Sequence, residues 1–151
     1  MLQKSFTIRV YGLLINKKEE MLIALEMVKG KFITKFPGGG LEFGEGLIDC
    51  LIREFKEELD LDIEVADHFY TTDFFVESFF NPYSQVIAVY YFVKTAKAID
   101  HLYNTELSDD LTEGGEHFIW KPLNELNADD FTLPIDKHVI ELLLKKLLFK
   151  K

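Results

Sequence analysis

The most regular hydrophobic pattern in the chain covers residues 48–59. Its apolar side chains recur at i, i+3, i+4, i+7 and i+11, at Ile48, Leu51, Ile52, Phe55 and Leu59. At 3.6 residues per turn this spacing forms one stripe, which predicts an amphipathic helix with the stripe facing the core. Glu54, Glu57 and Glu58 fall on the side away from the stripe. The pattern therefore predicts three carboxylates on one exposed helix face.

Runs of alternating or β-branched residues before and after this helix predict strands. They cover residues 6–11, 21–27, 31–36, 62–80, 85–95 and 117–120. Lys29-Gly30 favours a turn between the second and third runs, and the turn formers at 81–84 favour a β-hairpin between the fourth and fifth. Residues 134–149 are rich in aliphatic side chains and predict a second helix that packs on the core. This order of elements predicts an α/β fold, an α/β/α sandwich with a mixed β-sheet between helices.

Length and charge restrict the class of protein. The 151 residues suit a single domain, and the formal net charge of −9 argues against nucleic acid as a partner, because phosphate backbones require clustered Lys and Arg. Cys50 is the only cysteine, so no intramolecular disulfide is possible. The longest apolar run, residues 86–93, is far shorter than the ~20 residues that span a bilayer. Since the first residues also lack a signal-peptide pattern, we expect a cytoplasmic protein with no membrane partner.

A glycine-rich segment directly precedes the acidic helix. Residues 37–40 read PGGG, and glycine allows the backbone to approach a ligand closely. Glu42 and Glu45 follow. On the helix alone, a solvated face with Arg53 and Lys56 between the carboxylates is the simpler interpretation. The glycines and further carboxylates in the same segment favour instead a site for a divalent cation, since Mg²⁺ takes oxygen ligands.

These residues resemble the signature of the Nudix hydrolases, MutT-like proteins whose motif reads G-x5-E-x7-R-E-U-x-E-E-x-G-U, with U a bulky apolar residue. The positions that match in register are Gly39, Glu45, Arg53, Glu54, Phe55, Glu57, Glu58 and Leu61. Asp60 stands where the family has glycine. A glycine there would end the helix in a left-handed conformation, which Asp adopts at some cost, so we expect the change to affect stability.

The resemblance implies a single Nudix domain over residues 1–151. It also implies a pyrophosphohydrolase that cleaves a nucleoside diphosphate linked to another moiety, with Mg²⁺ or possibly Mn²⁺. By motif position, Glu54, Glu57 and Glu58 would hold the metal, and Glu54 would also act as general base or orient the attacking water. Arg53 would orient the carboxylates by ion pairing.

Two more parts of the motif have less defined roles. Gly38 and Gly39 would bind substrate or metal through the backbone, with a loop carbonyl near Gly38 as a further ligand. Glu45 is either an outer-shell ligand or a favourable anion at the helix N-terminus, and the sequence leaves both open.

Three candidates lie outside the signature. Arg9 beside Tyr11 could bind a phosphate and stack on a base, and a solvent-facing strand surface explains the pair equally well. Lys35, shortly before the glycines, could reach a substrate phosphate, although a lone strand lysine is more often solvated. The resemblance suggests a further carboxylate from the region just before the strand at 117–120, where it would complete the metal site or serve as base. Glu116 is our choice as a second base, and Glu113 competes with it.

Other features have simpler structural interpretations. An aromatic cluster comprises Phe74, Phe75, Phe79, Phe80 and Tyr83, for which core packing or a homodimer interface is more expected than a substrate wall. The acidic residues 101–115 predict a mobile loop. Cys50 more plausibly permits close helix packing than binds Mg²⁺, which prefers oxygen.

Two other classes of function remain open. A nucleotide-metabolite binding module without catalysis could use the same fold, although such sensors usually carry a DNA-binding domain. A prenyl diphosphate isomerase also resembles it, but the residues for that chemistry are not evident. No pattern separates ADP-ribose, dinucleoside polyphosphates, nucleotide sugars and oxidised nucleoside triphosphates as substrates.

Overall fold

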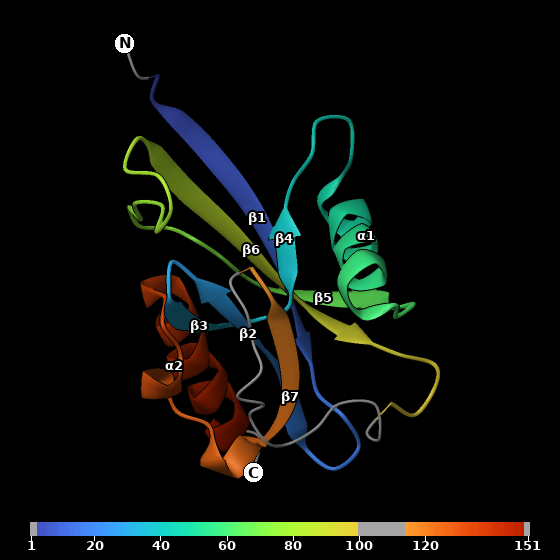
Figure 1. Cartoon of the computed structure of the whole chain (residues 1–151). Coiled ribbons are helices and arrows are strands. Elements are labelled where there is room, and N and C mark those ends of the chain that lie inside the picture. Colours follow the sequence, from blue (N-terminus) through green and yellow to red (C-terminus); the bar gives the residue numbers. More distant parts are fainter. Residues whose placement is uncertain (1–2, 100–113, 150–151) are drawn as a thin grey trace. The chain divides into compact units, whose positions relative to one another are not determined.

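The computed structural model describes residues 3–99 and 114–149 (Figure 1). They belong to two compact units. The first comprises Met1–Leu14 and Pro37–Ala98, and the second comprises Ile15–Phe36 and Ile99–Lys151. Glu113 and most of the predicted loop at 101–115 lie outside the described residues.

The first unit contains a four-stranded sheet and one helix. Its elements are β1 (Ser5–Leu14), β4 (Gly38–Gly40), α1 (Leu47–Leu59), β5 (Glu64–Thr71) and β6 (Ser84–Lys94). The strand order is β4-β1-β6-β5. β1 runs parallel to β6, whereas β4 and β5 run antiparallel to their neighbours. The sheet is therefore mixed, as predicted.

A glycine in β1 allows α1 to pack closely on this sheet. A Cβ atom on Gly12 would lie 2.7 Å from the ring of Phe55, which is itself only 1% exposed. Any side chain at residue 12 would push the Phe55 ring away. The close contact between helix and sheet thus depends on the absence of a side chain in the strand.

The buried side of α1 differs from the predicted stripe. Leu51 and Phe55 are buried as expected, but Ile48 and Ile52 are 48% and 40% exposed. Cys50 is fully buried instead. The helix is therefore rotated relative to the prediction. Its inner side packs against β4, a strand of three glycines, as well as against the apolar part of the sheet. Close packing at Cys50 was the preferred interpretation of that residue, and its burial agrees with it.

The end of α1 confirms the conformation expected at Asp60. Its φ of 51° and ψ of 37° lie in the left-handed region. The Asp60 amide donates to the Lys56 carbonyl at 3.1 Å, and the Leu61 amide donates to the Phe55 carbonyl at 3.3 Å. The helix thus ends at the position where the signature has glycine, although the residue carries a side chain.

The predicted hairpin of β5 and β6 is confirmed, but its first strand is shorter than expected. β5 ends at Thr71, and only an isolated bridge between Glu77 and Gln85 continues the pairing. Core packing was a wrong expectation for the aromatic cluster, because its side chains are 41–70% exposed. These residues lie in the loop around Pro82 and point outward. If the predicted strand had continued through them, its alternation would have buried some of them.

The second unit has an antiparallel sheet in the order β3-β2-β7. Its elements are β2 (Glu20–Val28), β3 (Lys31–Lys35), β7 (Glu116–Pro122), the short 3₁₀ helices η1 (Leu123–Glu125) and η2 (Ala128–Asp130), and α2 (Pro134–Phe149). Lys29 and Gly30 both have positive φ, 50° and 75°, which suits the tight turn predicted there. α2 has the predicted bounds.

The core of the second unit is aromatic and aliphatic. The rings of Phe36 and Phe131 stack with centroids 4.7 Å apart. On α2, Ile135, Val139 and Leu143 are buried at four-residue intervals, so one side of the helix is apolar. Within the described residues, no helix is long and apolar enough to cross a membrane.

Candidate functional site

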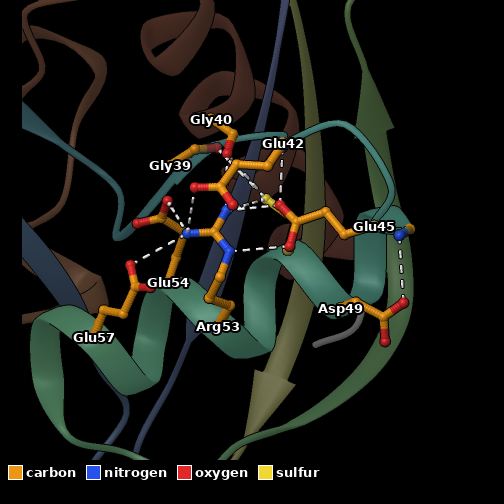
Figure 2. Close-up of polar contacts among 10 residues, drawn as sticks. Gly39, Gly40, Glu42, Glu45, Asp49, Arg53, Glu54 and Glu57 are labelled. Carbon is orange, nitrogen blue, oxygen red and sulfur yellow. Dashed lines mark hydrogen bonds and ion pairs between the residues drawn. The ribbon is translucent and has the colours of Figure 1, made fainter.

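Arg53 on α1 is the centre of a charged cluster in the first unit (Figure 2). Its Nε donates to Glu45 Oε2 at 2.9 Å, and its Nη2 donates to Glu45 Oε1 at 2.6 Å. This pair of bonds matches the planar fork of the guanidinium to both carboxylate oxygens. It fastens the loop before α1 to the middle of the helix.

Three more carboxylates approach the same guanidinium. Nη1 donates to Glu54 Oε1 at 3.0 Å and to Glu57 Oε2 at 3.2 Å, and Glu42 Oε1 lies 3.7 Å away. Four carboxylates therefore surround one cation. The cluster has an excess of negative charge, which a bound cation would relieve.

The glycine strand allows Glu54 to lie against the sheet. A Cβ atom on Gly39 would overlap the Glu54 carboxylate, so any other residue there would push this side chain out of its present place. Gly38 has a φ of 150°, and a Cβ there would overlap the Val10 carbonyl. The Gly40 carbonyl accepts a hydrogen bond from Arg53 Nη2 at 3.1 Å. The glycines thus form a cradle for Arg53 and Glu54.

Exposure differs among the predicted metal ligands. The Glu54 side chain is 12% exposed and that of Glu57 is 59% exposed. Glu58 is exposed on the next position of the helix. The expectation of three carboxylates on one exposed face is therefore wrong for Glu54, because the glycine cradle covers it.

The charges in the cluster shift the titration of its members. Hydrogen bonds from Arg53, with a further bond from the Glu42 amide, lower the pKa of Glu45 from 4.5 to about 2. The hydrogen bond to Glu45 in turn raises the pKa of Arg53 above its usual value. Burial, with Glu45 nearby, raises the pKa of Cys50 to about 12. At neutral pH the cluster contains a fixed cation, a fixed anion and a protonated thiol.

The side-chain atoms of the cluster that could bind a metal are, apart from the Cys50 sulfur, all carboxylate oxygens. Such oxygens suit a hard divalent cation. Glu54 and Glu57 converge on a single nitrogen of Arg53. Within residues 3–99 and 114–149, no three His, Cys, Asp or Glu side chains are grouped closely enough to enclose a metal ion. Arg53 sets the present spacing of the carboxylates.

Arg9 lies beside the glycine strand and contacts Tyr11, with its guanidinium carbon 5.6 Å from the centre of the Tyr11 ring. It opposes Gly40 in the β1–β4 register, and its Nε donates to the Tyr11 hydroxyl at 2.6 Å. Tyr11 is only 3% exposed and stacks on Tyr90 at 5.2 Å. The Tyr11 ring therefore belongs to the core, and of this pair only the half-buried Arg9 has an exposed part.

Lys35 and Glu116 belong to the second unit and contact each other. Lys35 Nζ lies 2.6 Å from Glu26 Oε2 and 3.4 Å from Glu116 Oε1. The Lys35 side chain is 8% exposed, so it is not the solvated lysine that a strand surface would have. The sequence did not predict this cluster, although Glu26 and Lys35 lie on strands expected to pair.

Comparison with known proteins identifies the family of this chain. The model of the NUDIX domain matches residues 5–143. The chain belongs to the Nudix family. The predicted Nudix fold is therefore confirmed, and the prediction of a Nudix pyrophosphohydrolase is confirmed at the level of the family. Members of this family generally use divalent metals.

Solved structures share the fold at low identity. A MutT protein from Methanosarcina mazei Go1 has a TM-score of 0.67 and 20% identity, over 97% of this chain and 98% of that one. A NUDIX hydrolase from Nitrosomonas europaea has a TM-score of 0.69 and 17% identity, over 93% and 89%. An ADP-ribose pyrophosphatase from Streptococcus suis 89-1591 has a TM-score of 0.57 and 19% identity, over 93% and 90%. None of the curated proteins matches this chain in sequence.

Two members of the Arg53 cluster were absent from the predicted site residues. Glu42 contacts Arg53, and the Gly40 carbonyl accepts one of its hydrogen bonds. Gly40 is the last of the glycines and Glu42 lies between them and Glu45, so their place in the loop was visible in the sequence. The sequence did not show that these two groups point towards Arg53, because their direction depends on how the loop turns back over α1.

Proposed function

We propose that this protein hydrolyses the pyrophosphate linkage of a nucleoside diphosphate joined to another moiety, in a reaction that depends on Mg²⁺ or Mn²⁺. The observation that carries the proposal is the cluster of four carboxylates around Arg53 and the glycine strand. Gly39, Glu45, Arg53, Glu54 and Glu57 of this cluster all stand at positions of the Nudix signature.

The carboxylates of α1 hold the metal in this proposal. Glu54, Glu57 and Glu58 supply oxygen ligands, and a loop carbonyl near Gly38 supplies another. The excess negative charge of the cluster and its oxygen donors support this assignment. When bound, the ion neutralises charge on the pyrophosphate and lowers the pKa of a coordinated water.

Glu54 is the proposed general base, which takes a proton from the attacking water. Its carboxylate is fixed by Gly39 on one side and by Arg53 on the other, which supports a role that needs defined orientation. Arg53 is a positioning residue, since it bonds Glu45, Glu54 and Glu57 at once. Glu45 holds the loop in place, and because its pKa is lowered to about 2 it stays ionised well below neutral pH.

The remaining candidates stay predictions with different support. Arg9 lies next to Gly40 in the strand register and is proposed to contact a substrate phosphate. Glu116 as a second base and Lys35 as a phosphate contact would have to act in spite of their ion pair. We also propose that residues 1–151 work as one Nudix domain, in line with the match over 5–143. A cytoplasmic location, the absence of nucleic-acid and membrane partners, and a homodimer are likewise predictions.

A phosphate-release screen tests the proposed activity. ADP-ribose, a dinucleoside polyphosphate, a nucleotide sugar and an oxidised nucleoside triphosphate would each be incubated with the protein and Mg²⁺ or Mn²⁺, followed by phosphatase where the product requires it. We expect turnover of at least one compound, abolished by EDTA and restored by excess metal. Binding of a compound by calorimetry without any turnover would support the non-catalytic binding module instead.

A further inference from the structure

Every N–H group of the Arg53 guanidinium already donates to an oxygen atom. Nε and one N–H of Nη2 donate to Glu45, and the other N–H of Nη2 donates to the Gly40 carbonyl. The two N–H groups of Nη1 donate to Glu54 at 3.0 Å and to Glu57 at 3.2 Å. A guanidinium has five N–H groups in a fixed plane, and these five bonds use all of them.

The Glu42 carboxylate lies outside this set of five bonds. Its Oε1 is 3.7 Å from Nη1 of Arg53, which is close enough for an ion pair but too far for a hydrogen bond. Figure 2 shows Glu42 approaching Nη1 from the loop, whereas Glu57 approaches the same nitrogen from the helix. Glu42 therefore lies close to an N–H group that Glu57 uses.

Backbone hydrogen bonds hold Glu42 at this place independently of Glu57. The Glu42 amide donates to Glu45 Oε1 at 2.9 Å, and the Glu42 carbonyl accepts from the Glu45 amide at 3.3 Å. Glu45 is in turn fastened to Arg53 by two hydrogen bonds. Only the Glu42 side chain, which is 68% exposed, has to turn for its carboxylate to reach Nη1.

Glu54 and Glu57 differ in how easily they can leave Arg53. The Glu54 side chain is 12% exposed and lies against Gly39, so its carboxylate is confined. The Glu57 side chain is 59% exposed, and its bond to Nη1 is the longer of the two. Because no three candidate ligands among the described residues are grouped closely enough to enclose a metal ion, ligation as proposed above requires a carboxylate to move. Glu57 is the member of this pair that is free to do so.

We propose that Glu42 takes the place of Glu57 at Arg53 when Glu57 turns to a divalent cation. Glu42 accepts the N–H of Nη1 that Glu57 releases, so all five N–H groups of Arg53 keep an acceptor. Arg53 then continues to hold Glu45 and Glu54 in their present positions. Glu42 is thus a positioning residue that acts through Arg53, and this role rests on the proposed metal-dependent function.

A double-mutant cycle in EDTA tests the exchange without metal or substrate. Urea unfolding would compare the effect of Glu42→Ala in the parent and in Glu57→Ala, where the N–H of Nη1 is released permanently. We expect a small effect in the parent, because Glu57 occupies that N–H. In Glu57→Ala the urea midpoint should fall by about 0.3 M more, the size expected for the loss of an exposed ion pair.

Glu57→Gln is the matched control for this cycle. It removes the charge of Glu57 but keeps an oxygen atom that can accept from Nη1. If repulsion between like charges were the only link between Glu42 and Glu57, Glu42→Ala would have the same effect in the Gln and Ala backgrounds. The exchange requires a released N–H, so we expect the additional loss of stability in Glu57→Ala alone.

Calorimetric titration with Mn²⁺ alone tests the same role in metal binding. Glu42→Asp keeps the charge, but its side chain is one methylene shorter and does not reach Nη1. The dissociation constant for Mn²⁺ should therefore rise about 5-fold, which corresponds to the upper end of what an exposed ion pair contributes. The control is Glu64→Asp, which shortens a carboxylate that is 73% exposed and paired with Lys94, and it should leave the dissociation constant unchanged.

The results that reject this role differ from those that reject the proposed function. Equal effects of Glu42→Ala in the parent, Glu57→Gln and Glu57→Ala would show that Glu42 does not replace Glu57. Equal Mn²⁺ affinity of the parent and Glu42→Asp would reject the role of Glu42 while leaving the metal site in place. A parent protein that does not bind Mn²⁺ at all would reject the proposed function and this role together.

Discussion

The two units each contain a cation surrounded by carboxylates, and the two clusters differ in charge balance and burial. In the first unit, Arg53 meets four carboxylates, of which those of Glu42 and Glu57 are 68% and 59% exposed. In the second, Lys35 meets two carboxylates, and its own side chain is 8% exposed. The first cluster keeps an accessible excess of negative charge, whereas the second is smaller, more buried and closer to neutral.

This difference indicates which cluster can do chemistry. The charge of a buried ammonium between two carboxylates is already balanced by them, so its removal leaves those anions without compensation. An exposed excess of carboxylates can accept another cation at little structural cost. We therefore expect substitutions at the first cluster to change activity more than stability, and substitutions at the second to change stability.

The largest expected effect is the loss of hydrolysis in Glu57→Gln. The substitution keeps size and helix propensity but removes a charge from the exposed side of the Arg53 cluster. Turnover of the best substrate from the screen should fall on the order of 100-fold or more, as when a preorganised electrostatic partner is lost. The control is Glu64→Gln, which removes a carboxylate that is 73% exposed and paired with Lys94. Equal turnover in the parent and in Glu57→Gln would contradict the proposed mechanism.

Lys35→Met should destabilise the protein by about 2 kcal/mol, measured by urea unfolding. Glu26 and Glu116 would then be partly buried anions without their cation. The double variant Lys35→Met/Glu26→Gln should recover part of the loss, since one of the two anions is gone. An unchanged unfolding free energy in Lys35→Met would show that the second cluster is not structural.

The pair of Arg53 and Glu45 should give a stability difference that depends on pH. The pKa of Glu45 is lowered in the folded state, so its contribution is present above the unfolded value of 4.5 and is lost as pH falls towards about 2. The free energies of unfolding of the parent and Glu45→Gln should therefore differ at pH 6 and converge between pH 4.5 and 2. If the difference in unfolding free energy between the two proteins does not decrease between pH 4.5 and pH 2, another group causes it.

The smallest effect is expected at the end of α1. Asp60→Gly should stabilise the protein by up to about 1 kcal/mol, because glycine has no Cβ penalty at a φ of 51°. It also removes an exposed ion pair with Lys56, 3.2 Å long, which offsets only a small part of this gain. Asp60→Asn removes the same charge but keeps a side chain, so it should gain nothing. A loss of stability in Asp60→Gly would contradict the expected cost of the left-handed conformation.

Much of the secondary structure was predictable because short-range patterns determine it. The bounds of α2 and the turn at Lys29-Gly30 were predicted closely, since helix periodicity and positive-φ residues act locally. The left-handed end of α1 was also predicted, from the helix signature around Asp60. The candidate site could be located in one segment because its glycines and carboxylates lie within 23 consecutive positions, 39–61.

The sequence by itself determined which residue types are available at the site, their helical spacing and the excess of carboxylates over cations. Tertiary structure decided the rest. Glu54 is covered rather than exposed because a strand of glycines lies against it, and Ile52 is exposed because α1 packs through Cys50 instead. Lys35 contacts Glu116 because β7 pairs with β2 from far along the chain. Periodicity fixes the direction of a side chain relative to its own helix or strand, whereas its partner depends on contacts between distant segments.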